Sequence, residues 1–158
     1  MRWLPGVAAA ALLASCIVVE VPVDDGRRAA DPPAAPPPVA SAPGSGDRRL
    51  VEQMAGAVNA HRRSVRCPEL VWMQAVANAA QGHSLDMARR NYFNHTSPEG
   101  LGPADRLRAH GVDYRAMGEN IAQHPGTPRE VLAGWLASPG HRQNLERCGY
   151  THHGIGLR

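Results

Sequence analysis

Apolar residues recur through much of this chain at the three- and four-residue steps typical of amphipathic helices. This spacing predicts one helix over residues 48–63 and a longer one over about 73–90. At 127–130, a Thr-Pro-Arg-Glu capping box with proline at the first helical position predicts the start of another helix. Shorter helices are expected over residues 103–110 and 141–147, each followed by a stop signal.

Two segments of the C-terminal half have the character of strands instead. Residues 117–122 and 154–157 are short, mainly apolar and bounded by polar or glycine residues. Helices and strands therefore alternate irregularly within one region.

The first sixteen residues form a separate apolar pattern. A basic start precedes an apolar run over residues 7–14, which is shorter than the ~20 residues needed to cross a bilayer. This is typical of a secretory signal peptide. The run ends in Leu13-Ala14-Ser15-Cys16, which resembles the lipobox of bacterial lipoproteins.

That resemblance implies acylation of Cys16 and cleavage just before it, so that lipid chains anchor the protein to a membrane. Ile17, rather than an aspartate, then favours the outer membrane of a Gram-negative cell. The alternative is an ordinary cleaved signal in which Cys16 occurs by chance. Either way, we expect an exported protein of the cell envelope.

Residues 17–46 are rich in proline and alanine, and residues 47–158 have the mixed pattern of a folded domain. A proline-rich stretch of this kind buries too little apolar surface to compensate for the entropy of ordering. We therefore predict a disordered tether over 17–46 between a lipid anchor and one small domain at 47–158.

Charge adds little to this interpretation. All 17 basic residues are arginine, and the formal net charge is only +3. The arginines are scattered in short pairs, whereas nucleic-acid binding favours a concentrated basic face. We therefore expect no nucleic-acid partner.

Two cysteines, Cys67 and Cys148, remain after Cys16. In an oxidising compartment an even pair favours a structural disulfide. Closing a loop of about eighty residues would stabilise the fold by roughly 4 kcal/mol. The alternative is two separate buried thiols.

Seven short segments together resemble one known family. In order they are 58–63 (VNAHRR), 70–72 (LVW), 79–84 (AAQGHS), 93–97 (FNHTS), 118–122 (GENIA), 135–142 (WLASPGHR) and 154–156 (GIG). The chain resembles the CAP superfamily, also called SCP-like domains, and its bacterial branch in particular. The resemblance covers residues 50–157. It implies an α+β domain, a three-layer α-β-α sandwich with a small antiparallel sheet, whose final strand, after Gly-x-Gly, we expect to be missing here.

The resemblance also implies a cleft with two histidines and two glutamates, in which the histidines of some members hold a divalent metal. His95 fits the first histidine, Glu119 the first glutamate and His141 the second histidine. No acidic residue lies where the second glutamate is expected, and Ser138 is nearest to that place.

The chemistry of these three side chains allows several roles. Two neutral imidazoles and a carboxylate can bind Zn²⁺ and leave a position for water. Glu119 could instead hold one imidazole N–H and fix its tautomer. A purely structural polar cluster is the third alternative.

Three functions follow from these alternatives. The first is a non-enzymatic envelope module that binds a small ligand, a lipid, a partner or a divalent metal. The second is a metal-dependent hydrolase or peptidase using His95, Glu119 and His141, although HExxH and nucleophile motifs are absent. The third is a structural envelope protein without a ligand.

The remaining aromatic side chains and histidines are expected to be structural. Trp72 and Trp135 are predicted to anchor the core, and His83 lies on the apolar stripe of a helix. His152 and His153 are predicted to lie on a surface turn.

Overall fold

The computed structural model of this protein describes residues 12–22, 45–124 and 126–158. The elements in chain order are β1 (Leu12–Glu20), α1 (Ser45–Ser64), β2 (Val71–Trp72), α2 (Gln74–Arg90), α3 (Pro103–Ala109), β3 (Ala116–His124), α4 (Pro128–Ala137), α5 (Pro139–Glu146) and β4 (His152–Leu157). Each helix expected from the sequence is present within a few residues. None of the helices in these ranges is long and apolar enough to span a bilayer.

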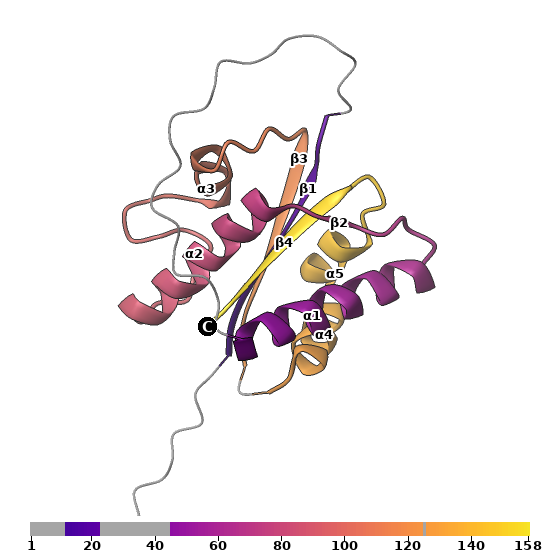
Figure 1. Ribbon diagram of the computed structural model, residues 1–158, viewed down its shortest axis with the longest axis horizontal. Helices are drawn as coiled ribbons and strands as arrows, with labels where there is room; N and C mark the ends of the chain where they lie inside the picture. Colours follow the sequence, from indigo (N-terminus) through magenta and orange to yellow (C-terminus); the bar gives the residue numbers. More distant parts are fainter. Residues whose placement is uncertain (1–11, 23–44, 125) are drawn as a thin grey trace, which may run out of the picture.

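The four strands form one sheet in the order β2-β4-β1-β3, and helices cover both of its faces. Figure 1 shows α1, α4 and α5 on one side of the sheet and α2 and α3 on the other. This is the expected α+β fold with three layers. The sheet is mixed rather than wholly antiparallel, because β2 runs parallel to β4.

Each face of the sheet has its own apolar core. On the first face, side chains of the sheet pack against α1, α4 and α5, including Val18, Met54, Val58, Trp135 and Leu145. On the second face they pack against α2 and α3, including Ile17, Val19, Val76, Ala80 and Leu107.

The Gly-Ile-Gly segment of β4 lets α2 approach the sheet closely. A Cβ at Gly154 would overlap backbone atoms of Ala77, and one at Gly156 would overlap backbone atoms of Gln81. The alanines of α2 and the glycines of β4 are therefore parts of one contact, which fixes the helix directly over the strand.

Strand β1 is the main departure from the expected organisation. It lies inside the sheet and runs antiparallel to both neighbours, so that Cys16 is opposite Asn120 on β3 and Ile155 on β4. Residues 13–19 are all buried. The structure thus places residues 12–20 in the sheet, ahead of the domain start predicted at residue 47.

The reason is a physical ambiguity in the sequence. A short continuous apolar run is typical both of a signal peptide and of a strand that is buried on both faces. The sequence alone does not choose between them, and the structure pairs this run as a strand. Most of the predicted tether (residues 23–44) and the start of the signal-like segment (residues 1–11) lie outside the described residues.

Strand β4, which contains the Gly-Ile-Gly segment, has a neighbouring strand on each side. The absence of a family strand after Gly-x-Gly stays a prediction. Among the described residues the sheet has four strands, and β1 covers the side of β4 that faces away from β2. Leu13 and Arg158 also exchange backbone hydrogen bonds, so β1 is paired to the last residue of β4 and beyond.

The predicted disulfide between Cys67 and Cys148 is confirmed, with a sequence separation of 81 residues. It joins the turn after α1 to the segment before β4. Cys16 is free and only 1% exposed. Burial, and then the charge of Glu119, raise the pKa of the Cys16 thiol to about 12.

Candidate functional site

The carboxylate of Glu119 is the centre of a buried polar cluster on β3. The side chain is 2% exposed. Ser15 Oγ on β1 donates a hydrogen bond of 3.0 Å to Oε1, and Arg106 Nη2 on α3 lies 2.8 Å from Oε1 and 3.0 Å from Oε2. His95 Nδ1 lies 2.9 Å from Oε2. Both oxygens therefore have partners inside the protein.

These contacts keep Glu119 ionised. Burial alone would raise its pKa, but the His95 hydrogen bond and the Arg106 guanidinium outweigh burial and hold the pKa below its usual range. A carboxylate with several charge-assisted partners is a strongly held acceptor.

Arg106 connects this cluster to the loop that carries His95. Its Nη1 donates to the carbonyl oxygens of His95, at 3.0 Å, and Leu101, at 3.1 Å. Its Nε is buried and has no partner among the described residues. Neither the composition nor the family motifs marked Arg106, although it provides the countercharge for Glu119.

His95 and His141 come from different elements and lie near each other. His95, on the loop before α3, has a side chain that is 47% exposed. His141 lies in the first turn of α5, where burial and then the charge of His95 lower its pKa. The structure thus brings the two predicted histidines within electrostatic range, and Glu119 contacts the first of them.

The Glu119 carboxylate contacts Arg106 as well as His95. Within the described ranges no group of three or more His, Cys, Asp or Glu side chains is arranged to hold a metal. Because Arg106 contacts both carboxylate oxygens, the geometry allows Glu119 to orient the His95 imidazole, which is the second role considered from its chemistry. Ser138, which is nearest to the missing glutamate, lies where α4 meets α5.

Asparagine side chains hold α5 against the cluster. Asn120 Nδ2 donates to the carbonyl oxygen of His141 at 3.0 Å, and Asn144 Nδ2 donates to Asn120 Oδ1 at 2.9 Å. A Cβ at Gly118 would lie 2.7 Å from Asn144 Oδ1, so a side chain at this position would displace the Asn144 amide. The Gly-Glu-Asn motif thus serves the position of His141 as well as that of His95.

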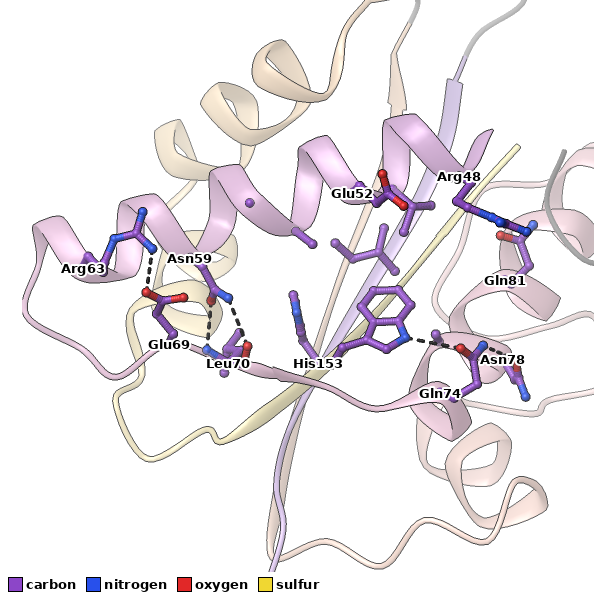
Figure 2. Close-up of a pocket in the computed structure, with 16 residues that line it drawn as sticks. Arg48, Glu52, Asn59, Arg63, Glu69, Leu70, Gln74, Asn78, Gln81 and His153 are labelled. Atoms are coloured by element: carbon purple, nitrogen blue, oxygen red, sulfur yellow. Dashed lines mark hydrogen bonds and ion pairs between the residues drawn. The ribbon is translucent and has the colours of Figure 1, made fainter. Parts of the chain in front are cut away.

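A groove of about 1110 Å³ opens at the other edge of the sheet. Figure 2 shows α1 along one side, the segment that contains Leu70 along the other, and His153 rising between them. The walls come from α1, from residues 69–72, from α2 and from β4. Sequence reasoning did not predict this groove, because its walls are distant in the sequence.

His153 is the most unusual group in the groove. The residue is 2% exposed, yet its Nδ1 has no hydrogen-bond partner among the described residues. Burial, followed by the charges of Arg62 and His152, lowers its pKa to about 4, so the ring is neutral at neutral pH. The predicted surface turn at 152–153 is wrong, because β4 begins there and alternation turns His153 inward.

Trp72 is not the core anchor that was expected. It is 40% exposed at the groove, and its ring packs edge-on against His153 with 5.5 Å between centroids. Trp135 is 2% exposed and donates to the carbonyl oxygen of Ile121, as a core residue would. His83 is also buried, with Nε2 2.9 Å from the carbonyl oxygen of Asn94.

Residues 55–158 match the family model described as CAP, the cysteine-rich secretory protein family. The chain belongs to the CAP family. The matched region contains His95, Glu119, His141, most of the groove and the disulfide of this CAP domain. Strand β1 lies before the matched region.

Two Bacillus subtilis proteins are similar in sequence to this CAP domain. YkwD is 38% identical over 98 residues, which cover 62% of this chain and 38% of YkwD. The membrane protein YlbC is 43% identical over 89 residues, which cover 56% of this chain and 26% of YlbC. The chain therefore matches less than half the length of either relative.

Solved structures share the fold. An extracellular protein containing an SCP domain from Bacillus anthracis matches with a TM-score of 0.68 and 37% identity, over 75% of this chain and 42% of that one. An outer surface protein from Borrelia burgdorferi matches with a TM-score of 0.52 and 17% identity, over 64% of this chain and 74% of that one. The second likeness concerns the fold alone.

Proposed function

We propose that this protein is an exported CAP-domain binding module that holds a divalent metal or small ligand at His95 and His141 and catalyses no reaction. The observation that carries the proposal is the 2.9 Å contact between Glu119 Oε2 and His95 Nδ1. A neutral His95 with its proton on Nδ1 keeps the Nε2 lone pair available on a partly exposed ring. Carboxylates commonly orient metal-binding histidines in this way.

The position of Glu119 argues against the hydrolase alternative. A general base must reach the proton that it abstracts. The Glu119 side chain is 2% exposed, and the guanidinium of Arg106 lies against both of its oxygens. A binding role for the histidines requires no such free carboxylate.

Zinc titration of the full chain by calorimetry tests the metal proposal. We expect modest affinity that falls as the pH drops through the histidine range near ~6.5, because protonated imidazoles do not bind metal. His95→Ala and His141→Ala should each abolish binding, whereas the control His152→Ala should leave it unchanged. Glu119→Gln should weaken binding roughly 10–100-fold. Undiminished binding by either alanine variant of the pair would overturn the assignment.

Export is the second part of the proposal. It is supported by the signal-like start of the chain, by the Cys67–Cys148 disulfide and by the extracellular SCP-domain protein that it resembles. Lipid anchoring at Cys16 remains a prediction. In the folded chain the Cys16 thiol is buried and stays protonated, so acylation would have to precede the pairing of β1.

Membrane fractionation with intact-mass analysis distinguishes acylated from unacylated Cys16. If Cys16 is acylated, Cys16→Ser should move the protein from the membrane to the soluble fraction and remove the acyl mass. Equal membrane association of both forms would reject the lipobox interpretation. An unacylated full-length mass would indicate that residues 12–20 remain in the sheet.

A further inference from the structure

The outer edge of β2 presents main-chain groups to the groove. The N–H groups of Val71 and Met73 donate to Thr151 and His153, so these two residues face β4. Strand residues alternate in the direction of their hydrogen-bonding groups. The N–H and C=O of Leu70 and Trp72 therefore face away from β4.

At Leu70, a side-chain amide already makes the hydrogen bonds that a neighbouring strand would make. Asn59 Nδ2 on α1 donates to the carbonyl oxygen of Leu70 at 3.0 Å, and Leu70 N–H donates to Asn59 Oδ1 at 2.9 Å. This is the paired donor-and-acceptor contact that a neighbouring backbone makes in a ladder. Trp72 lies two residues further along the same edge.

A second side-chain amide makes the same pair of hydrogen bonds at the edge of β4. Gln81 Nε2 on α2 donates to the carbonyl oxygen of Leu157 at 3.0 Å, and Leu157 N–H donates to Gln81 Oε1 at 3.1 Å. Side-chain amides from α1 and α2 therefore hydrogen-bond the main-chain groups of the sheet edge at two separate places in the groove. The edge at Trp72 lies between these two amide contacts and next to the unpartnered Nδ1 of His153.

The groove has room beside Trp72. Helix α1 lines it there with the small residues Ala55 and Gly56, and a Cβ at Gly56 would meet nothing within 4 Å. In Figure 2, α1 and the β2 segment are tied together at Asn59 and diverge towards Glu52 and Arg48. An extended chain could enter from this wider end.

We propose that this groove binds an extended peptide, whose backbone pairs with the edge of β2 at Trp72 in continuation of the Asn59–Leu70 pair. Addition of a strand to a sheet edge is an established mode of peptide recognition. The rings of His153 and Trp72, which pack against each other, supply an apolar wall. This site is separate from His95 and His141 and does not depend on the function proposed for them.

The arrangement favours a peptide over an oligosaccharide. A sugar is recognised mainly through side-chain amides and hydroxyls, and the amides here are engaged within the protein. Asn59 and Gln81 bind the backbone, and Gln74 Nε2 donates to Asn78 Oδ1 at 2.9 Å. The groups directed into the groove at Trp72 are main-chain groups, which a peptide backbone complements.

The test uses the full chain and a randomised library of fluorescently labelled peptides of about six residues, a usual strand length. Binding is measured by fluorescence anisotropy, and the best single peptide is taken forward. Gly56→Leu should fill the groove and weaken binding at least about tenfold. The matched control is Gly134→Leu, an exposed helical position on α4 that also has open space and lies outside the groove. It should bind as the wild type does.

Backbone methylation tests the mode of binding. N-methylation of the selected peptide at each residue in turn should abolish binding at alternate positions, because a paired strand directs every second N–H to its neighbour. Equal tolerance at all positions would overturn strand addition. Absence of any library peptide that distinguishes Gly56→Leu from Gly134→Leu would overturn the peptide site. Binding of a chito-oligosaccharide that Gly56→Leu abolishes, without peptide binding, would also overturn it.

Discussion

A titratable side chain is buried near each edge of the sheet, and the two side chains differ in how completely they are hydrogen-bonded. At the β3 edge, Glu119 has partners for both oxygens from Ser15, His95 and Arg106. At the β2 edge, His153 is equally buried but its Nδ1 has no partner among the described residues. Buried polar groups in proteins are nearly always hydrogen-bonded, so the unpartnered His153 Nδ1 is an exception within the described residues.

The comparison distinguishes a cluster that positions other side chains from a groove that has room for a ligand. The Glu119 cluster ties α3, the His95 loop, β1 and β3 together, and the side chain of His95 is partly exposed to solvent. In the groove around His153, the amide side chains of the walls are hydrogen-bonded within the protein, whereas His153 Nδ1 has no partner among the described residues. A family motif led to the first site, whereas the second has no motif and arises from packing.

The largest effect is expected from removing the countercharge of Glu119. Arg106→Leu leaves a buried carboxylate without its cation, which should cost roughly 3–5 kcal/mol of unfolding free energy. Urea denaturation measures this change. The control Arg108→Leu breaks the solvent-exposed Arg108–Asp105 pair and should change stability by no more than about 0.5 kcal/mol. If the two variants are equally stable, the cluster is not the buried electrostatic centre described here.

The next effect distinguishes the two edges by pH. The pKa of His153 is about 4 in the folded protein and near ~6.5 when unfolded, so the unfolded state binds the proton first on acidification. Its contribution to stability is therefore complete above about pH 6.5 and is lost as the pH falls towards 4. Between pH 7 and pH 5 the loss should be about 2 kcal/mol.

His153→Phe should remove that slope, as measured by denaturation at the two pH values. Glu119→Gln is the comparison. The folded pKa of Glu119 is also lowered, so its contribution is lost only below the ordinary glutamate range, near ~4.3. Equal slopes for wild type and His153→Phe between pH 7 and pH 5 would contradict a buried neutral imidazole.

The smallest effect concerns two buried serines, one on each side of the comparison. Ser15 Oγ donates to Glu119, and Ser84 Oγ donates to the carbonyl oxygen of Gly156 at 3.0 Å. Replacing either with alanine should cost about 1 kcal/mol. Only Ser15→Ala should also change the NMR chemical shifts of the His95 ring, because only Ser15 shares a carboxylate with it. A shift of equal size in Ser84→Ala would show that the cluster is not locally organised.

The sequence by itself determined the helices, their starts and the family. The capping box at Thr127 and Glu130 is formed as expected, because its signal lies within four adjacent residues. The pairing of Cys67 with Cys148 followed from the cysteine count and the expected compartment. His95, Glu119 and His141 were identified through motifs, and the structure brings them together at the β3 edge of the sheet.

Only the tertiary structure decided the rest, because each remaining feature depends on contacts between distant segments. The apolar run at 12–20 suits a signal peptide and a buried strand alike, and only pairing with β3 and β4 selects the strand. Arg106 resembles any other helical arginine until α3 packs beside Glu119. The inward direction of His153 follows from the register of β4, and the groove around it exists because α1 and α2 flank the same open edge of the sheet.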